Sequence, residues 1–194
     1  MEADTNMGRI VLGMIFGIAL APVVVVAWLW FGSLPVAVAD RPLPYERLIT
    51  GIPLDVRIDR ELVKIPPLQA NEDNLVAGAR VYHDQCAVCH GLYGKPSSIG
   101  PHMFPAAPPL WEPHRHGAET MVGVSGDPPG ETYWKVANGI RLTGMPSYIQ
   151  VLSDVQMWQV SLLLANAGKP LPPAAVEILF DQEPPAPKPE SEKP

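Results

Sequence analysis

The sequence predicts an all-α protein with one N-terminal transmembrane helix, and three observations lead to this prediction. Residues 10–39 contain no charged side chain. Apolar residues recur at helical spacing around residues 72–85 and again around 154–165. Proline accounts for 24 of the 194 residues, more than twice its usual share of about 5%. Much of the remaining chain is therefore expected to be loop, extended connection or tail.

Residues 10–33 are expected to form the transmembrane helix and to stay in the mature chain as an anchor. The stretch IVLGMIFGIALAPVVVVAWLWF can cross about 30 Å of hydrocarbon as a helix. Trp28, Trp30 and Phe31 gather at its C-terminal end, where aromatic rings favour the headgroup layer. A cleaved signal peptide is the alternative, because Ala37-Val38-Ala39 resembles a cleavage site. The apolar stretch is longer than the apolar core of about 7–15 residues that is typical of signal peptides, which favours the anchor.

Four further segments are expected around this helix. Residues 1–9 form a short cytoplasmic arm, and residues 34–71 form a charged, proline-punctuated stalk with limited structure, such as an extended piece at 54–58. Residues 72–169 form the main domain. Residues 170–194 are rich in proline, and we expect them to be disordered or docked on a partner.

Three helices are expected in the main domain, at 72–85, 132–137 and 154–165. Between the first two, residues 91–130 contain eight prolines and seven glycines, so no long helix is expected there. A loop of this length in a compact domain suggests that it wraps a large rigid ligand. The residues expected to cap or line these helices are Asn71 or Asn74, Leu75, Ala79 and Tyr82 in the first, Asn138-Gly139 after the second, and Ser153, Val155, Gln156, Trp158, Leu162 and Ala165 in the third.

The charge pattern and the motif content argue against two broad function classes. The net charge is −6, and residues 74–169 carry six acidic and six basic residues. No basic cluster appears, so nucleic-acid binding has little support. Neither glycine-rich phosphate motif occurs, which argues against a nucleotide-binding loop.

Both cysteines of the chain lie in the stretch QCAVCHG, at Cys86 and Cys89, directly before His90. A disulfide between them would close a very small loop and add little stability. A structural zinc site normally needs four protein ligands, and only two thiolates are available. A thioredoxin-like redox pair favours a βαβ context, which the sequence does not show. The pattern C-x-x-C-H is the attachment signature of haem c, in which two thiols bind the vinyl groups and the imidazole binds the iron.

A sixth ligand to the iron has several candidates in the sequence. Met145 lies between Gly144 and Pro146 in the loop TGMPSY, and a thioether suits low-spin haem iron. A methionine that merely fills a gap in the core is the alternative. Two further methionines outside the helices, Met103 and Met121, and four histidines, His83, His102, His114 and His116, are the other candidates.

With these motifs in place, residues 72–168 resemble a class I c-type cytochrome. The matching pieces are the helix leading into CAVCHG, the proline-rich loop, the helix end YWKVANGIR, the loop TGMPSY and the closing helix LSDVQMWQVSLLLANAG. The resemblance implies one covalent haem c, with Cys86 and Cys89 as thioether links. It implies His90 and Met145 as axial ligands of the haem iron.

The resemblance also implies contacts inside the domain. The first and last helices of this family cross, which predicts Gly78 and Tyr82 against Trp158 and Leu162. A loop carbonyl holds the proximal imidazole, and Gly100-Pro101 is the candidate loop. Trp134 and Arg141 are candidates for bonding a haem propionate.

The function implied is single-electron transfer by a membrane-tethered monohaem cytochrome, between respiratory or photosynthetic redox partners, and not enzymatic turnover. The chain is expected in the bacterial inner membrane as a single-pass protein with its haem domain in the periplasm. It acts as a free carrier or as a fixed subunit of a larger complex. A haem enzyme subunit or gas sensor with a vacatable sixth ligand is the alternative.

Overall fold

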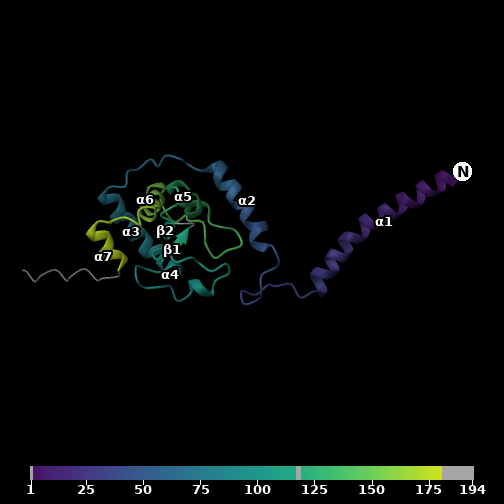
Figure 1. Ribbon diagram of the computed structural model, residues 1–194, viewed down its shortest axis with the longest axis horizontal. Coiled ribbons are helices and arrows are strands. Elements are labelled where there is room, and N and C mark those ends of the chain that lie inside the picture. Colours follow the sequence, from purple (N-terminus) through teal and green to yellow (C-terminus); the bar gives the residue numbers. More distant parts are fainter. Residues whose placement is uncertain (1, 117–118, 181–194) are drawn as a thin grey trace, which may run out of the picture. The chain divides into compact units, whose positions relative to one another are not determined.

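The computed structural model describes residues 2–116 and 119–180, with only the backbone described for residues 2–6 and 116. It is mostly helical, as predicted, with one short hairpin that was not (Figure 1). The elements in chain order are α1 (Glu2–Phe31), α2 (Glu46–Glu61), α3 (Glu72–Gln85), α4 (Ala87–His90), the 3₁₀ helix η1 (Gly100–His102), β1 (Pro113–His116), β2 (Glu119–Val122), α5 (Pro129–Asn138), α6 (Asp154–Ala165) and α7 (Pro173–Leu179).

The chain divides into two compact units between Glu46 and Arg47, and the first of them contains α1. Within α1, the segment Met7–Phe31 is long and apolar enough to cross a membrane, and none of it is buried. Pro22 lies inside the helix without ending it. An exposed helix of this composition is consistent with the predicted anchor.

The core of the second unit is built on the crossing of α3 and α6. Gly78 of α3 lies so close to α6 that a Cβ atom there would stand 2.3 Å from the carbonyl oxygen of Gln159 and 3.1 Å from Cβ of Leu163. The predicted crossing of the first and last helices of the domain is therefore present. The predicted contact residues were wrong for Gly78, because Gln159 and Leu163 lie against it, whereas the predicted contact of Tyr82 stays a prediction.

Trp158 instead turns toward α5, where its ring stacks on Tyr133 with centroids 4.2 Å apart. Leu162 and Trp158 are buried as expected, whereas Val155 is 48% exposed. The cause is the composition of α6, which is apolar on most of its circumference. Helical spacing alone cannot decide which apolar side of such a helix meets which neighbour.

The helix ends follow local sequence signals. Asn71 caps α3 by accepting from the backbone N–H of Asn74. Ser153 and Gln156 form a reciprocal capping box at the start of α6, as predicted. Gly139 ends α5 with a φ of 68°, a conformation that glycine adopts without the strain of a side chain.

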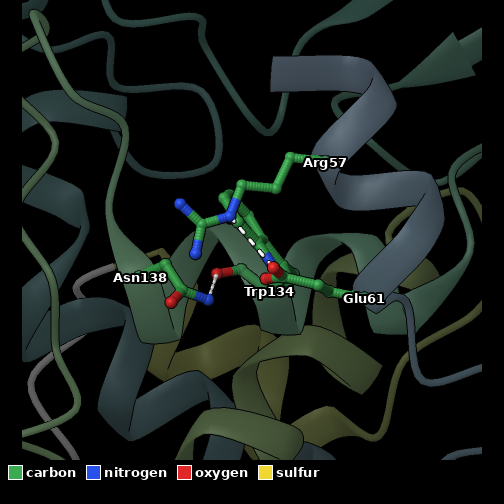
Figure 2. A network of polar contacts seen from close by, with 4 residues as sticks. All are labelled: Arg57, Glu61, Trp134 and Asn138. Carbon is green, nitrogen blue, oxygen red and sulfur yellow. Dashed lines mark hydrogen bonds and ion pairs between the residues drawn. The ribbon is translucent and has the colours of Figure 1, made fainter. Parts of the chain in front are cut away.

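The segment expected as a stalk with limited structure contains α2, so the predicted extended piece at 54–58 was wrong. Ile58 is only 3% exposed, because this face of α2 packs on the domain. Figure 2 shows how the C-terminal end of α2 meets α5: Trp134 donates its indole N–H to Glu61 at 2.8 Å, and the Arg57 guanidinium lies 5.8 Å from the Trp134 ring centroid. Such tertiary contacts stabilise a helix whose internal proline lowers its intrinsic propensity.

The predicted tail at 170–194 also begins with a structured piece. Residues 173–179 form α7, in which Ala175 and Leu179 are almost completely buried. Pro172 and Pro173 stand at the start of this helix, where the missing N–H costs nothing. Residues 181–194 lie outside the described part of the chain, so the expectation for them stays a prediction.

Among its described residues, 91–116 and 119–128, the proline-rich segment after His90 contains no α-helix, as expected. It holds η1 and the antiparallel hairpin β1–β2, whose register pairs Pro113 with Val122 and His116 with Glu119. The hairpin escaped the sequence analysis because its strands have only four residues each and lack alternating apolar positions.

Candidate functional site

The two cysteines and His90 share one helical turn that continues directly from α3. Cys86 ends α3 and begins α4, and the backbone N–H of His90 donates to the Cys86 carbonyl at 3.0 Å. Both thiols are free and half-buried. Burial, and secondarily the charge of Cys89, raises the pKa of the Cys86 thiol to about 12. The structure therefore brings together the three residues of the C-x-x-C-H signature, with both thiols unbridged.

The imidazole of His90 is held from one side by the loop that follows it. Its Nδ1 lies 2.8 Å from the carbonyl oxygen of Pro108. A carbonyl oxygen can only accept, so Nδ1 carries the proton and Nε2 keeps a free lone pair. Burial lowers the pKa of His90, while the hydrogen bond to Pro108 opposes that shift. The neutral imidazole thus presents Nε2 as a potential metal ligand.

The carbonyl that holds His90 is not the one predicted, since Gly100-Pro101 was the candidate. Gly100 lies against the turn itself: a Cβ atom at this position would stand 2.2 Å from the Cys89 carbonyl oxygen. The absence of a side chain lets η1 pack on the turn. The chain then continues past η1 until Pro108 reaches the imidazole, a path that no local pattern reveals.

Ser97 fastens the same turn, and the sequence analysis did not single it out. Its hydroxyl donates to the Val88 carbonyl at 2.6 Å and accepts from the backbone N–H of Gly100 at 2.9 Å. Tyr82 adds a buried contact by donating its hydroxyl to the Gly91 carbonyl at 2.6 Å. A serine in a proline-rich loop gives no sequence signal that separates this role from simple solvent exposure.

Met145 lies in the loop between α5 and α6, half-buried and packed against the hydrophobic core. Its backbone N–H donates to Thr143 Oγ1 at 3.0 Å, and its carbonyl accepts from Ile140 at 3.2 Å. Gly139 permits this loop to close, because a Cβ atom there would stand 2.9 Å from the Met145 carbonyl oxygen and 2.7 Å from the Ser147 nitrogen.

Tyr148 connects the Met145 loop to the cysteine turn, and this role was not foreseen either. Its hydroxyl donates to the Gln85 carbonyl at 2.9 Å, immediately before Cys86. Burial raises the pKa of Tyr148, with smaller contributions from the charges of Cys86 and Cys89. Two segments that are about 60 residues apart in the chain therefore meet at this hydroxyl.

The other candidates have weaker support. Trp134 uses its only N–H on Glu61, so it was wrong as a propionate donor. Arg141 is exposed, and its role stays a prediction. His102 and His114 are exposed and His83 is half-buried, while the His116 side chain lies outside the described atoms. Within the described residues, no cluster of three or more His, Cys, Asp or Glu residues is suitable for a metal ion.

These residues fit a haem c better than the alternatives weighed above. The thiols are free, they sit on one turn with the imidazole, and the Nε2 lone pair is unused by the protein. A thioether is available from a second segment that is fastened to the same turn through Tyr148. The described residues supply only two thiolates and no ligand cluster to complete a zinc site.

Comparison with known proteins agrees with this geometry. Residues 73–162 match the family model described as cytochrome c oxidase, cbb3-type, subunit III. No curated protein and no solved structure matches the chain. The matched segment contains the cysteine turn and the Met145 loop. Residues 73–162, a little under half of the chain, are therefore similar to a c-type cytochrome family, and this similarity implies haem binding and electron transfer.

Proposed function

We propose that the chain is a membrane-tethered monohaem cytochrome c that transfers single electrons between respiratory or photosynthetic redox partners at the periplasmic face of a bacterial inner membrane. The observation that carries this proposal is the hydrogen bond from His90 Nδ1 to Pro108, on the same turn as two free thiols. It fixes the tautomer that leaves Nε2 available to iron.

Cys86 and Cys89 are the proposed covalent links. With haem c bound, these two thiols would hold it through thioether bonds to its vinyl groups. The turn suits this role because α4 and its N-cap, Cys86, bring both cysteines and His90 together within five residues. The covalent links make the attachment independent of the strength of the axial bonds.

His90 and Met145 are the proposed axial ligands. A haem bound in this way supplies a one-electron couple, and a thioether ligand raises its potential relative to a second imidazole. The protein's part is to hold both ligands in place: Pro108 orients the imidazole, and Thr143 and Ile140 fix the backbone at Met145. A site that keeps both ligands in both oxidation states reorganises little during transfer.

The domain division supports a tethered carrier or a fixed subunit. Residues 10–33 are the proposed anchor, residues 34–71 the connection, whose helix α2 packs on the domain, and residues 72–169 the haem domain. Attachment of haem c takes place outside the cytoplasmic membrane, which puts the haem domain in the periplasm and the N-terminus inside. The anchor raises the effective concentration of the domain at membrane partners. The family description, which is that of an oxidase subunit, favours membrane complexes as partners.

The near-neutral haem domain leads us to expect weak electrostatic steering, because residues 74–169 carry equal numbers of acidic and basic residues. The rate of electron transfer with a partner should then change little between low and moderate salt. A steep fall in this rate would contradict the expectation.

The proposed function is tested on the full chain purified in mild detergent. We expect haem staining after denaturing electrophoresis, an intact mass equal to polypeptide plus one haem, and a redox titration with one electron. A colourless chain at its bare polypeptide mass would overturn the proposal. Rapid and complete carbon monoxide binding by the reduced protein would instead favour the haem enzyme or gas sensor.

A further inference from the structure

Helix α2 is apolar on two opposite faces, and only one of them packs on the domain. At about 100° per residue, Leu54 and Ile58 fall on one side of the helix, whereas Ile49, Ile52 and Val56 fall on the other. A surface helix normally has one apolar stripe and a polar opposite face. The second stripe of α2 therefore calls for an explanation.

The inner face is firmly held. Ile58 is 3% exposed, Trp134 donates to Glu61, and Arg57 is bonded to Glu61 at 3.0 Å while lying over the Trp134 ring (Figure 2). Just after α2, the chain passes so close to α5 that a Cβ atom at Gly130 would stand 2.1 Å from the carbonyl oxygen of Val63. These contacts make α2 an integral part of the second unit and fix the direction of its outer face.

We call the four residues Leu48, Ile49, Ile52 and Val56 the outer stripe. Their exposed fractions are 56%, 68%, 53% and 42%. Asp55 borders the stripe on one side and Arg60 borders it on the other, whereas Asp59 falls in line with the stripe, just beyond its C-terminal end. An exposed aliphatic surface on a helix whose opposite face is packed on the domain is typical of a docking surface.

The position of the stripe in the chain indicates its partner. The candidate membrane span ends at Phe31, and only residues 32–45 separate it from α2. These 14 residues reach at most about 50 Å when fully extended. With the anchor inserted, the stripe is confined near the bilayer surface at high effective concentration.

We propose that the outer stripe of α2 docks in the interfacial layer of the lipid bilayer beside the anchor, and so orients the second unit on the membrane. This inference rests on the anchor in the proposed function. Amphipathic helices in this layer bury their apolar face among headgroups and upper acyl chains. Because the borders of the stripe carry no excess of positive charge, docking is driven by apolar contact and does not require anionic lipid.

The test uses the full-length haem-containing chain, alone, in nanodiscs of neutral phosphatidylcholine. Single cysteines are introduced by Ile52→Cys in the stripe, Ile18→Cys in α1 and Ala174→Cys on the exposed side of α7, and each is spin-labelled. Collision with oxygen, which concentrates in lipid, is compared with collision with a water-soluble nickel chelate. The intact mass reports one label per chain and whether the native cysteines carry haem.

We expect the label at position 52 to collide with the nickel chelate several-fold less often than the label at 174, and with oxygen more often. Adding Ile49→Asp to the Ile52→Cys chain should restore nickel access. Replacing a quarter of the neutral lipid by anionic lipid should change neither result.

Two outcomes overturn the inference and can be told apart. If position 18 is lipid-exposed but position 52 is as accessible to nickel as position 174, the anchor stands and the stripe faces water, which leaves a protein partner as its occupant. If position 18 is itself accessible to nickel, the anchor of the proposed function fails, and the docking proposal fails with it. The haem assignment is unaffected in both cases, because the mass reports it separately.

Discussion

The two halves of the candidate haem site are fastened in different ways. The cysteine turn is held by a loop that lies well downstream, through Pro108 on His90 and Ser97 on Val88. The Met145 loop is held through Thr143 and Ile140 on Met145, and through Ser147 and Tyr148 on carbonyls of the preceding helix α5. Its only described side-chain hydrogen bond to the cysteine segment comes from Tyr148.

This difference indicates that the turn is the stronger half and the Met145 loop the weaker one. A segment held by several distant contacts opens only when a large part of the domain opens, whereas a locally closed loop can open by itself. If the proposed function is right, substitutions in the domain should leave the covalent links and the His90 ligand in place. The bond between Met145 and the iron should be the first to weaken.

The largest effect is expected from removing the covalent side. Cys86→Ser combined with Cys89→Ser should abolish haem staining and return the chain to its bare polypeptide mass, because a hydroxyl does not form the thioether.

Met145→Ala should keep the covalent haem but open the sixth position, so the reduced protein binds carbon monoxide quickly. Mass spectrometry and ferrous spectra measure both. Loss of covalent haem in Met145→Ala would invert the ranking.

A smaller effect is expected from Gly139→Ala, which places a Cβ atom within 2.9 Å of backbone atoms of the Met145 loop at a φ of 68°. We expect a loss of about 2 kcal/mol or more in the free energy of unfolding, together with weakening of the ferric iron–sulfur absorption band. Urea titration and absorption spectra measure these changes.

Gly94→Ala is the matched control, because Gly94 has a φ of 71° but nothing within 4 Å of its Cβ position. It should cost only the backbone strain of about 1 kcal/mol and leave the iron–sulfur band intact. Equal effects of the two variants would show that the crowding at Gly139 does not matter.

Tyr148→Phe should have a smaller effect than Gly139→Ala. It removes the hydrogen bond to Gln85 that joins the two halves, at a cost of about 1 kcal/mol. Carbon monoxide should then reach the reduced site faster, since the Met145 loop opens more readily. Tyr93→Phe is the control, because the Tyr93 hydroxyl has no side-chain hydrogen bond among the described contacts. If the two variants bound carbon monoxide at the same rate, the joining role of Tyr148 would be refuted.

The smallest effect is expected at alkaline pH, at the base of the Met145 loop. Tyr133 of α5 donates to Asp154 of α6, and this hydrogen bond raises the Tyr133 pKa to about 12. An unfolded tyrosine titrates near pH 10, so the contribution is fully present below about pH 10 and is lost as the pH rises to about 12. The phenol is partly solvated, so the loss should stay below about 1 kcal/mol. Comparison with Tyr133→Phe, which should lack this step, measures it.

The sequence predicted the helices at 72–85 and 154–165 closely, and the cysteine turn as well. Their signals are local: Asn71 and Ser153 cap by bonding backbone groups three residues away. Two cysteines and a histidine within five residues need only one helical turn to come together. Helices α2 and α7 were missed because their prolines weaken the local signal, and their stability comes from burial of residues such as Ile58 and Leu179.

The sequence by itself determined the chemistry that this protein can offer, because thiols, imidazole and thioether are side-chain properties and the C-x-x-C-H spacing is a property of one helical turn. Only the tertiary structure decided that Pro108, and not Gly100-Pro101, holds the imidazole, and that Tyr148 ties the Met145 loop to the cysteine turn. It also decided which side of α6 meets α3. These contacts join residues far apart in the chain, so they are selected by the packing free energy of the whole domain and leave no periodic signal in the local sequence.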